Sequence, residues 1–133
     1  MAAQTNEELI AAVFAALAEG DGRPLVAAMA EDFSWHFAGQ WSKDWGSTRE
    51  QTRRKLLAPL MAQFADYRCR AEEIIAAGDR VVVRATAEAR TTRGEAYPQA
   101  YCYVFGLEQG QITEVIEYCD TALVERVLTL PES

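Results

Sequence analysis

The sequence contains few histidines and cysteines, the side chains that most often bind zinc or form disulfides. It has one histidine, His36, and three cysteines, Cys69, Cys102 and Cys119, which lie far apart in the chain. An odd number of cysteines without the spacing of zinc ligands argues against a disulfide framework and against a zinc site. A glycine-rich phosphate loop between a strand and a helix is also missing. We therefore expect a protein that needs no metal and no organic cofactor.

Long apolar runs and an excess of positive charge are missing as well. No apolar run approaches the roughly 20 residues of a membrane span, and the first eight residues are acidic where a signal peptide carries a basic flank. The 13 Lys and Arg residues against 20 Asp and Glu residues give a net charge of −7. Because phosphate contacts need a basic surface, this chain is a poor nucleic-acid binder. These features favour a cytoplasmic protein that binds neither membranes nor nucleic acids.

What is present is an ordinary globular composition. Half of the 133 residues are hydrophobic, and 25% are charged. A disordered chain does not carry this much apolar content. The length suits one domain, spanning residues 1–133, and it is enough to bury a single substantial core.

The first part of the chain has the pattern of helices. Thr5 and Glu8 have the spacing of a capping box, and apolar residues then recur with helical period until Gly20. Pro24 suits the first turn of a second, short helix, where its missing N–H costs little. These signals predict two helices ahead of the first strand.

A third helix is predicted after a loop at residues 39–47. Thr48 and Gln51 repeat the capping-box spacing, and apolar residues follow at helical spacing. Pro59 lies inside this run, so we expect the helix to kink or break near Leu57.

The rest of the chain alternates with period two. From Tyr67 onward, apolar and polar side chains fall on opposite faces, and short turn sequences separate the alternating segments. Strands joined by short turns are antiparallel neighbours, and helices must cover one face of such a sheet. The prediction is an α+β fold: a curved antiparallel sheet wrapped around three N-terminal helices, with a short C-terminal helix. The expected strands are residues 33–38, 80–92, 101–105 and 112–119.

Three segments, residues 14–21, 31–39 and 103–122, carry a resemblance to a known family. Their order and spacing resemble the nuclear transport factor 2-like superfamily, and within it the SnoaL-like and ketosteroid isomerase-related proteins. The resemblance implies a cone-shaped, cystatin-like α+β barrel with a deep pocket for a small apolar or amphipathic molecule. It also implies a homodimer formed through the outer face of the sheet.

Ketosteroid isomerases need a catalytic base and two hydrogen-bond donors to an oxyanion. In the resemblance, the position of the family's base carboxylate falls at His36. An imidazole can do the same work, because it titrates in the range that suits proton transfer at neutral pH. One donor position falls at Val13, which has no donor group, and the other falls at or near Tyr103. The residue set of a steroid isomerase is therefore incomplete.

Limonene-type epoxide hydrolases need an Arg-x-Asp pair on a middle strand and a second carboxylate on the last strand. The pair falls at Ala85 and Ala87, or one residue away at Arg84 and Thr86, so it is missing in both registers. The last-strand carboxylate matches Glu117, which is also where SnoaL-type cyclases keep an acid or base. If this carboxyl points into an apolar pocket, desolvation raises its pKa.

The candidate catalytic residues are His36 as base, Glu117 as acid or its partner, and Tyr103 as hydrogen-bond donor to an enolate oxygen. The predicted function is binding of a small apolar molecule, with proton transfer next to a carbonyl (isomerisation, aldol cyclisation or dehydration) as the candidate reaction. The alternative is a non-catalytic small-molecule-binding or interaction module. The candidate ligand-binding residues are Tyr101, Trp41, Val13, Cys119 and Phe14.

The two central candidates also have purely structural explanations. His36 can be an ordinary structural histidine, and Glu117 can form an ion pair with an arginine such as Arg84. Geometry discriminates between these cases: the enzyme hypothesis requires both side chains to face one cavity, about one substrate width apart.

Other polar and aromatic residues have alternatives of the same kind. Trp41 and Trp45 either form a lid over the pocket mouth or anchor their loop. Asp120 is most simply the N-cap of a final helix that runs through Leu128.

Overall fold

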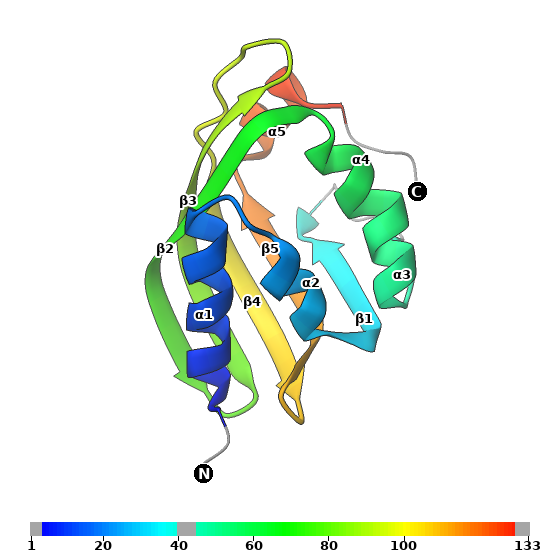
Figure 1. The fold of residues 1–133 in the computed structure, drawn as a ribbon, viewed down its shortest axis with the longest axis vertical. Helices are drawn as coiled ribbons and strands as arrows, with labels where there is room; N and C mark the ends of the chain where they lie inside the picture. Colours follow the sequence, from blue (N-terminus) through cyan, green and yellow to red (C-terminus); the bar gives the residue numbers. More distant parts are fainter. Residues whose placement is uncertain (1–3, 40–44, 130–133) are drawn as a thin grey trace.

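A single curved sheet carries the helices on its concave side (Figure 1). The computed structural model describes residues 4–39 and 45–129. The elements in chain order are α1 (Asn6–Ala18), α2 (Arg23–Ala28), β1 (Met29–Phe37), α3 (Arg49–Thr52), the π-helical turn η2 (Arg53–Leu57), α4 (Ala58–Met61), β2 (Phe64–Ala77), β3 (Arg80–Thr91), β4 (Ala100–Glu108), β5 (Gln111–Cys119) and α5 (Thr121–Val127).

The helix ends follow the local sequence signals. Thr5 caps α1 in a capping box with Glu8, in which each side chain accepts a backbone N–H of the other residue. Gly20 follows this helix with a φ of +81°, a conformation that glycine adopts without the strain that a side chain causes. Asp120 caps α5 by accepting a hydrogen bond from the Leu123 amide at 3.3 Å. The local signals alone therefore account for these boundaries.

The expected kink near Leu57 takes the form of a widened turn. The segment from α3 to α4 stays helical through η2, in which the Ala58 amide donates to the Arg53 carbonyl. In a regular α-helix the ring of Pro59 would clash with the carbonyl of Lys55. The π-helical turn relieves this clash, because it adds one residue to the turn just before the proline.

The sheet has the order β1-β5-β4-β3-β2, with β1 and β2 at its edges. The pairs β2–β3, β3–β4 and β4–β5 are antiparallel, as the short turns between them predict. β1 differs from the expected all-antiparallel sheet, because it pairs in parallel with β5. No short turn joins these two strands, so the rule for neighbouring strands does not constrain their direction.

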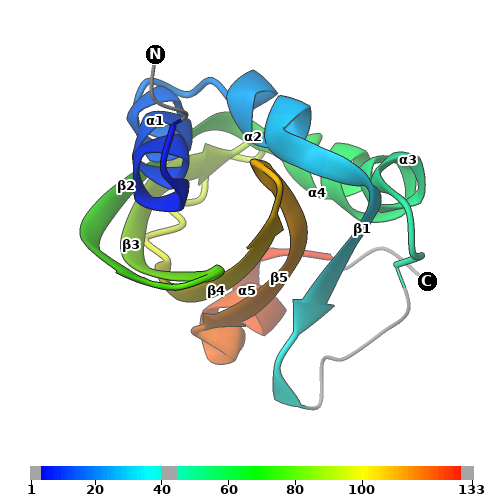
Figure 2. The same ribbon diagram turned by 90° about the horizontal axis from the view of Figure 1, so that it is seen from below.

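The two faces of the sheet have different environments. Inward positions on β3, such as Val83, are fully buried, whereas outward positions, such as Arg84, are exposed. Figure 2 shows the sheet curling around the side that holds α1 and α2. A smaller apolar cluster lies under α5 and contains Tyr97, Leu123 and Val124. Within the described part of the chain, no helix is long and apolar enough to cross a membrane.

Candidate functional site

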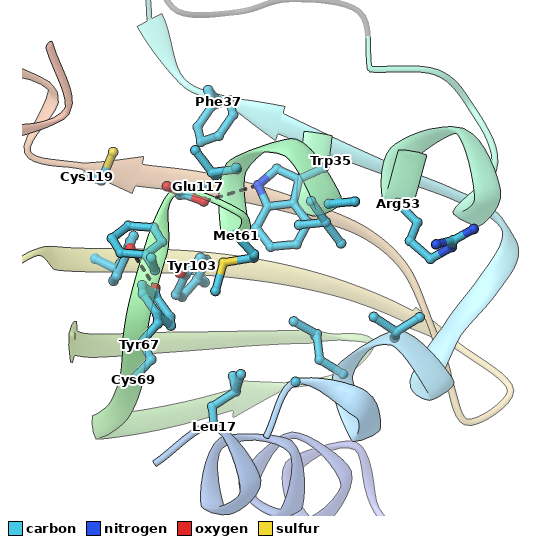
Figure 3. Close-up of a pocket in the computed structure, with 18 of the residues that line it drawn as sticks. Leu17, Trp35, Phe37, Arg53, Met61, Tyr67, Cys69, Tyr103, Glu117 and Cys119 are labelled. Atoms are coloured by element: carbon cyan, nitrogen blue, oxygen red, sulfur yellow. Dashed lines mark hydrogen bonds between the residues drawn. The ribbon is translucent and has the colours of Figure 1, made fainter. Parts of the chain in front are cut away.

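The sheet and the helices enclose a cavity of about 770 Å³ (Figure 3). This volume falls in the range of pockets that hold a drug-sized ligand. Helices α1 to α5 and strands β1, β2, β4 and β5 all contribute to its wall, which is mostly apolar and aromatic. Among the described residues that line it, the charged ones are Glu117, Arg23, Arg49 and Arg53.

Strand alternation on β5 directs Glu117 into this cavity. Val115 and Glu117 are buried on the concave face, whereas Tyr118 on the opposite face is 51% exposed. Glu117 lies between Phe37 of β1 and Tyr103 of β4, its register partners on the two neighbouring strands. Only 8% of Glu117 remains accessible to solvent, so the sheet places an acidic group in an apolar environment.

The surroundings of Glu117 change its acidity. Burial raises the pKa of this carboxyl from its ordinary value of 4.5 to about 7, because the ionised form loses its hydration. Hydrogen bonds from Cys119 and from the Trp35 indole N–H, which lies 3.2 Å from Oε1, stabilise the carboxylate and limit this rise in pKa. At neutral pH both protonation states are populated, as a general acid or base requires.

The alternative of an ion pair between Glu117 and Arg84 is excluded by their positions. Arg84 lies on the convex face and pairs with Glu73 of β2, with Nε 3.1 Å from Oε1. Glu117 faces the other side of the sheet.

Tyrosines form a polar group beside Glu117 in the cavity wall. The hydroxyls of Tyr67 and Tyr101 are 2.7 Å apart and hydrogen-bonded, and the ring of Tyr101 stacks on that of Tyr103 at a centroid distance of 4.9 Å. Burial raises the pKa of all three phenols well above 10, so they stay protonated. No described residue hydrogen-bonds to the Tyr103 hydroxyl. It can therefore donate to a ligand.

The expectation that His36 provides a base in the pocket is wrong. Its side chain is exposed on the convex side of β1, where Nε2 lies 3.0 Å from the Ser34 hydroxyl. Trp35 and Phe37, on either side of it, point into the cavity instead (Figure 3). The sequence already indicates this outward orientation of His36. Aromatic residues at 33, 35 and 37 alternate with Ser34 and His36, which predicts that the aromatic side chains share the inward face.

The other candidate residues divide between the cavity and the core. Tyr101, Tyr103 and Cys119 line the cavity. Val13 and Phe14 were expected there, but they are buried in the core, where the Phe14 ring contacts Phe105 at a centroid distance of 6.0 Å. The helix presents Leu17, one turn after Val13, to the cavity instead.

Of the two loop tryptophans, Trp45 belongs to the described residues. Trp41 lies outside the described residues. Trp45 is buried and packs edge-to-face on Phe37 at a centroid distance of 6.2 Å. This contact supports the anchoring alternative for Trp45 and not the lid.

Sequence reasoning did not single out several residues of the wall. Tyr67, Arg49 and Arg53 line the cavity, whereas in the sequence Tyr67 marks only the start of the alternating region. The arginines recur every four residues with Leu57, a helical spacing that could have indicated a shared face. In residues 4–39 and 45–129, no three His, Cys, Asp or Glu side chains come together as metal ligands.

Residues 10–115 match the model of the SnoaL-like domain. The chain belongs to the SnoaL-like domain family. No curated protein sequence matches it. This SnoaL-like protein has the fold of an NTF2-like protein from Burkholderia thailandensis E264, with 19% identity, a TM-score of 0.78, and 94% of this chain and 98% of that one covered.

Two further solved structures share the fold. One is named as a SnoaL-like polyketide cyclase from Jannaschia sp. CCS1 (18% identity, TM-score 0.75, 99% of this chain and 100% of that one). The other is an LEH-like epoxide hydrolase from M. tuberculosis (23% identity, TM-score 0.67, 92% and 87%). Identities this low show the fold alone. In the SnoaL-like protein described here, the inward residues Ala85 and Ala87 of β3 provide neither the arginine nor the aspartate that epoxide opening needs.

Proposed function

We propose that this SnoaL-like protein binds a small, largely apolar molecule and catalyses cofactor-free proton transfer next to a carbonyl. One observation carries the proposal: Glu117, with a pKa raised to about 7, faces an apolar cavity beside the hydroxyl of Tyr103, to which no described residue hydrogen-bonds. The two groups come from register partners on β5 and β4, so both can reach one substrate. Isomerisation, aldol cyclisation and dehydration all begin with such a transfer.

The proposed step uses one base and one donor. The ionised carboxylate of Glu117 takes a proton from the carbon next to the carbonyl. The electron pair of that C–H bond forms the new C=C bond, and the carbonyl π electrons move to oxygen. Tyr103 donates a hydrogen bond to this oxygen, which stabilises the enolate in a water-poor site. Glu117 then returns the proton to carbon or to a leaving hydroxyl.

Hydrogen–deuterium exchange of 2-tetralone tests the step, because exchange at its C1 carbon needs only proton removal next to a carbonyl. We expect the protein to accelerate exchange, measured by NMR in deuterated buffer, and the rate to rise with pH and level off above about 7. Glu117→Gln should reduce the acceleration at least 100-fold, which is the scale of a lost general base. The control His36→Gln should keep it. An acceleration that survives in Glu117→Gln contradicts the proposed step.

The second candidate function is binding without catalysis. The position of His36 outside the cavity favours it, because Glu117 is then the only described carboxyl or imidazole in the wall. Bound 2-tetralone that exchanges no faster than in buffer would favour this alternative.

We also propose a homodimer formed through the convex face of the sheet. Ile75, Val82, Val104 and Ile116 are consecutive register partners across four strands, so they form an apolar band on that face. Sedimentation should give a mass of two chains for the wild type. Val104→Arg should shift it towards one chain, and a monomeric wild type would contradict the proposal.

The proposed location is the cytoplasm. Cys69, Cys102 and Cys119 are free thiols, and free thiols suit a reducing compartment. Fractionation of cells that express the protein at its natural level tests the location, and recovery outside the cytoplasmic fraction would contradict it.

A further inference from the structure

The charges in the cavity wall are separated along its length. Arg49 of α3 and Arg53 of η2 lie at one end, and Arg23 of α2 also lines the cavity. In Figure 3, Arg53 is on one side of Trp35, and Glu117 is on the other. The cavity therefore has a cationic end, an aromatic middle, and an inner part that holds the buried carboxyl.

The cationic end differs in charge from the rest of the chain. Residues 49–55 contain Arg49, Arg53, Arg54 and Lys55 against the single acid Glu50, whereas the whole chain carries a net charge of −7. Arg49, Arg53 and Leu57 recur every four residues and all face the cavity. The helical segment thus presents two guanidinium groups and an apolar side chain to the same space.

Both arginines are exposed and accessible to a ligand. Arg53 forms a two-point ion pair with Glu50, with Nη2 2.8 Å from Oε1 and Nε 3.1 Å from Oε2. The two side chains are 50% and 65% exposed, so solvent weakens the pair, and a ligand anion competes with Glu50 for this guanidinium. Arg49 donates one hydrogen bond, at 3.3 Å, to the Met29 carbonyl. A guanidinium has five N–H donors in a planar fork, which suits the paired oxygens of a carboxylate, phosphate or sulfonate.

The position of Glu117 fixes the direction in which such a ligand lies. An anionic group beside this carboxyl would be repelled whenever the carboxyl is ionised. At Arg49 and Arg53 the two guanidinium charges attract the same anionic group, and the group stays in contact with solvent. The ring system of the ligand then extends past Trp35 towards Glu117 and Tyr103.

We propose that the ligand is an anionic amphiphile: an apolar ring body with one carboxylate, phosphate or sulfonate group, which the exposed side chains of Arg49 and Arg53 bind at the end of the cavity away from Glu117. This inference rests on the proposed function, because it assumes that the cavity binds a small molecule. It adds the charge of the ligand and the end at which that charge lies.

Two fluorescent probes that differ in one group test the proposal. 8-Anilino-1-naphthalenesulfonate carries a sulfonate, and N-phenyl-1-naphthylamine has the same ring body without it. The double variant Arg49→Gln/Arg53→Gln should weaken binding of the sulfonate probe at least tenfold and leave that of the neutral probe within twofold. Added salt should weaken only the sulfonate probe. The control Arg84→Gln removes an arginine from the convex face and should change neither affinity.

The outcomes separate this inference from the proposed function. Unchanged binding of the sulfonate probe to the double variant, or an equal loss for both probes, overturns the inference and leaves cavity binding intact. Failure of both probes to bind the wild type overturns the proposed function and the inference with it. Retained binding of the neutral probe shows that the double variant is folded. Glu117→Gln at pH 8 should bind the sulfonate probe more tightly than the wild type, because one negative charge is removed.

Discussion

The two faces of the sheet give ionisable side chains opposite environments: the concave face buries them, and the convex face leaves them exposed to solvent. On the concave face, Glu117 is buried among aromatic rings, and its pKa rises to about 7. On the convex face, His36 is exposed and contacts Ser34. The two residues belong to adjacent, paired strands and differ only in the phase of alternation, since Phe37 and not His36 is the partner of Glu117. A shift of one residue along a strand therefore decides whether a titratable group can act as a buried acid or base.

The same contrast extends to other residues of the neighbouring strands. Tyr103 faces the cavity and Val104 the convex side, and Val83 is fully buried beside the exposed Arg84. The buried polar groups Glu117 and Tyr103 lie on one face, because only that face is covered by the helices. Substitutions at matched positions on the two faces test this contrast.

The largest difference is expected for truncation of apolar side chains. Phe105 is buried on the concave face, whereas Val104 is half-buried on the convex face. Phe105→Ala should lower the free energy of unfolding by about 3–5 kcal/mol, because it leaves a cavity in the core. Val104→Ala should cost about 1 kcal/mol or less. Urea denaturation of both variants measures the difference, and equal losses would show that the two faces are equally important for packing.

The second effect is the dependence of stability on pH through Glu117. The folded-state pKa of about 7 lies above the ordinary value of 4.5, so the folded protein binds more protons between these two values. Stability from this group is complete below pH 4.5 and is lost as the pH rises through 7, by about 3 kcal/mol in total.

Two matched variants, one on each face of the sheet, test this dependence of stability on pH. Glu117→Gln should remove this loss between pH 4.5 and 8 in urea denaturation, whereas His36→Gln should keep it. A Glu117→Gln protein that retains the same pH dependence would assign the effect to another group.

A smaller difference is expected between two tyrosines. The hydroxyl of Tyr67 makes a partly buried hydrogen bond with that of Tyr101, whereas Tyr118 is exposed on the convex face. Tyr67→Phe should lower the free energy of unfolding by about 1 kcal/mol, and Tyr118→Phe should leave it almost unchanged. Thermal denaturation of the two variants side by side checks this. A larger loss for Tyr118→Phe would reverse the assignment of the faces.

The smallest effect is expected for His36. Because its ring is exposed and its Nε2 hydrogen-bonds with the hydroxyl of Ser34, another convex-face residue, His36→Gln should change the free energy of unfolding by no more than about 0.5 kcal/mol. Exchange of 2-tetralone should also be unaffected. A tenfold loss of exchange in this variant would show that the convex face takes part in the chemistry.

The sequence predicted most of the fold, because its signals are local. The capping box at Thr5, the cap at Asp120 and the alternation on β3 each involve neighbouring residues, and the structure shows each of them. The parallel pairing of β1 with β5 involves segments about 80 residues apart in the chain, measured from Phe37 to its partner Glu117. No turn sequence specifies that pairing.

The candidate site was predicted only in part. Glu117, Tyr101 and Tyr103 line the cavity, whereas His36, Val13 and Phe14 do not. The prediction for His36 is wrong because it rests on the resemblance, whereas the alternation of the aromatic residues around His36 indicates the opposite face.

The sequence by itself determined the family, the order of the elements and the residue type at each inward position. Only the tertiary structure decided which of those residues share a cavity and how they titrate. The pKa of Glu117 depends on the loss of water around it, and that loss requires walls from β1, β4 and the helices, which the chain brings together from distant segments. The cationic end likewise depends on how α3 and η2 face the sheet. The desolvation of Glu117 and its separation from the arginines both depend on how distant segments enclose the cavity. No local stretch of sequence therefore determines them.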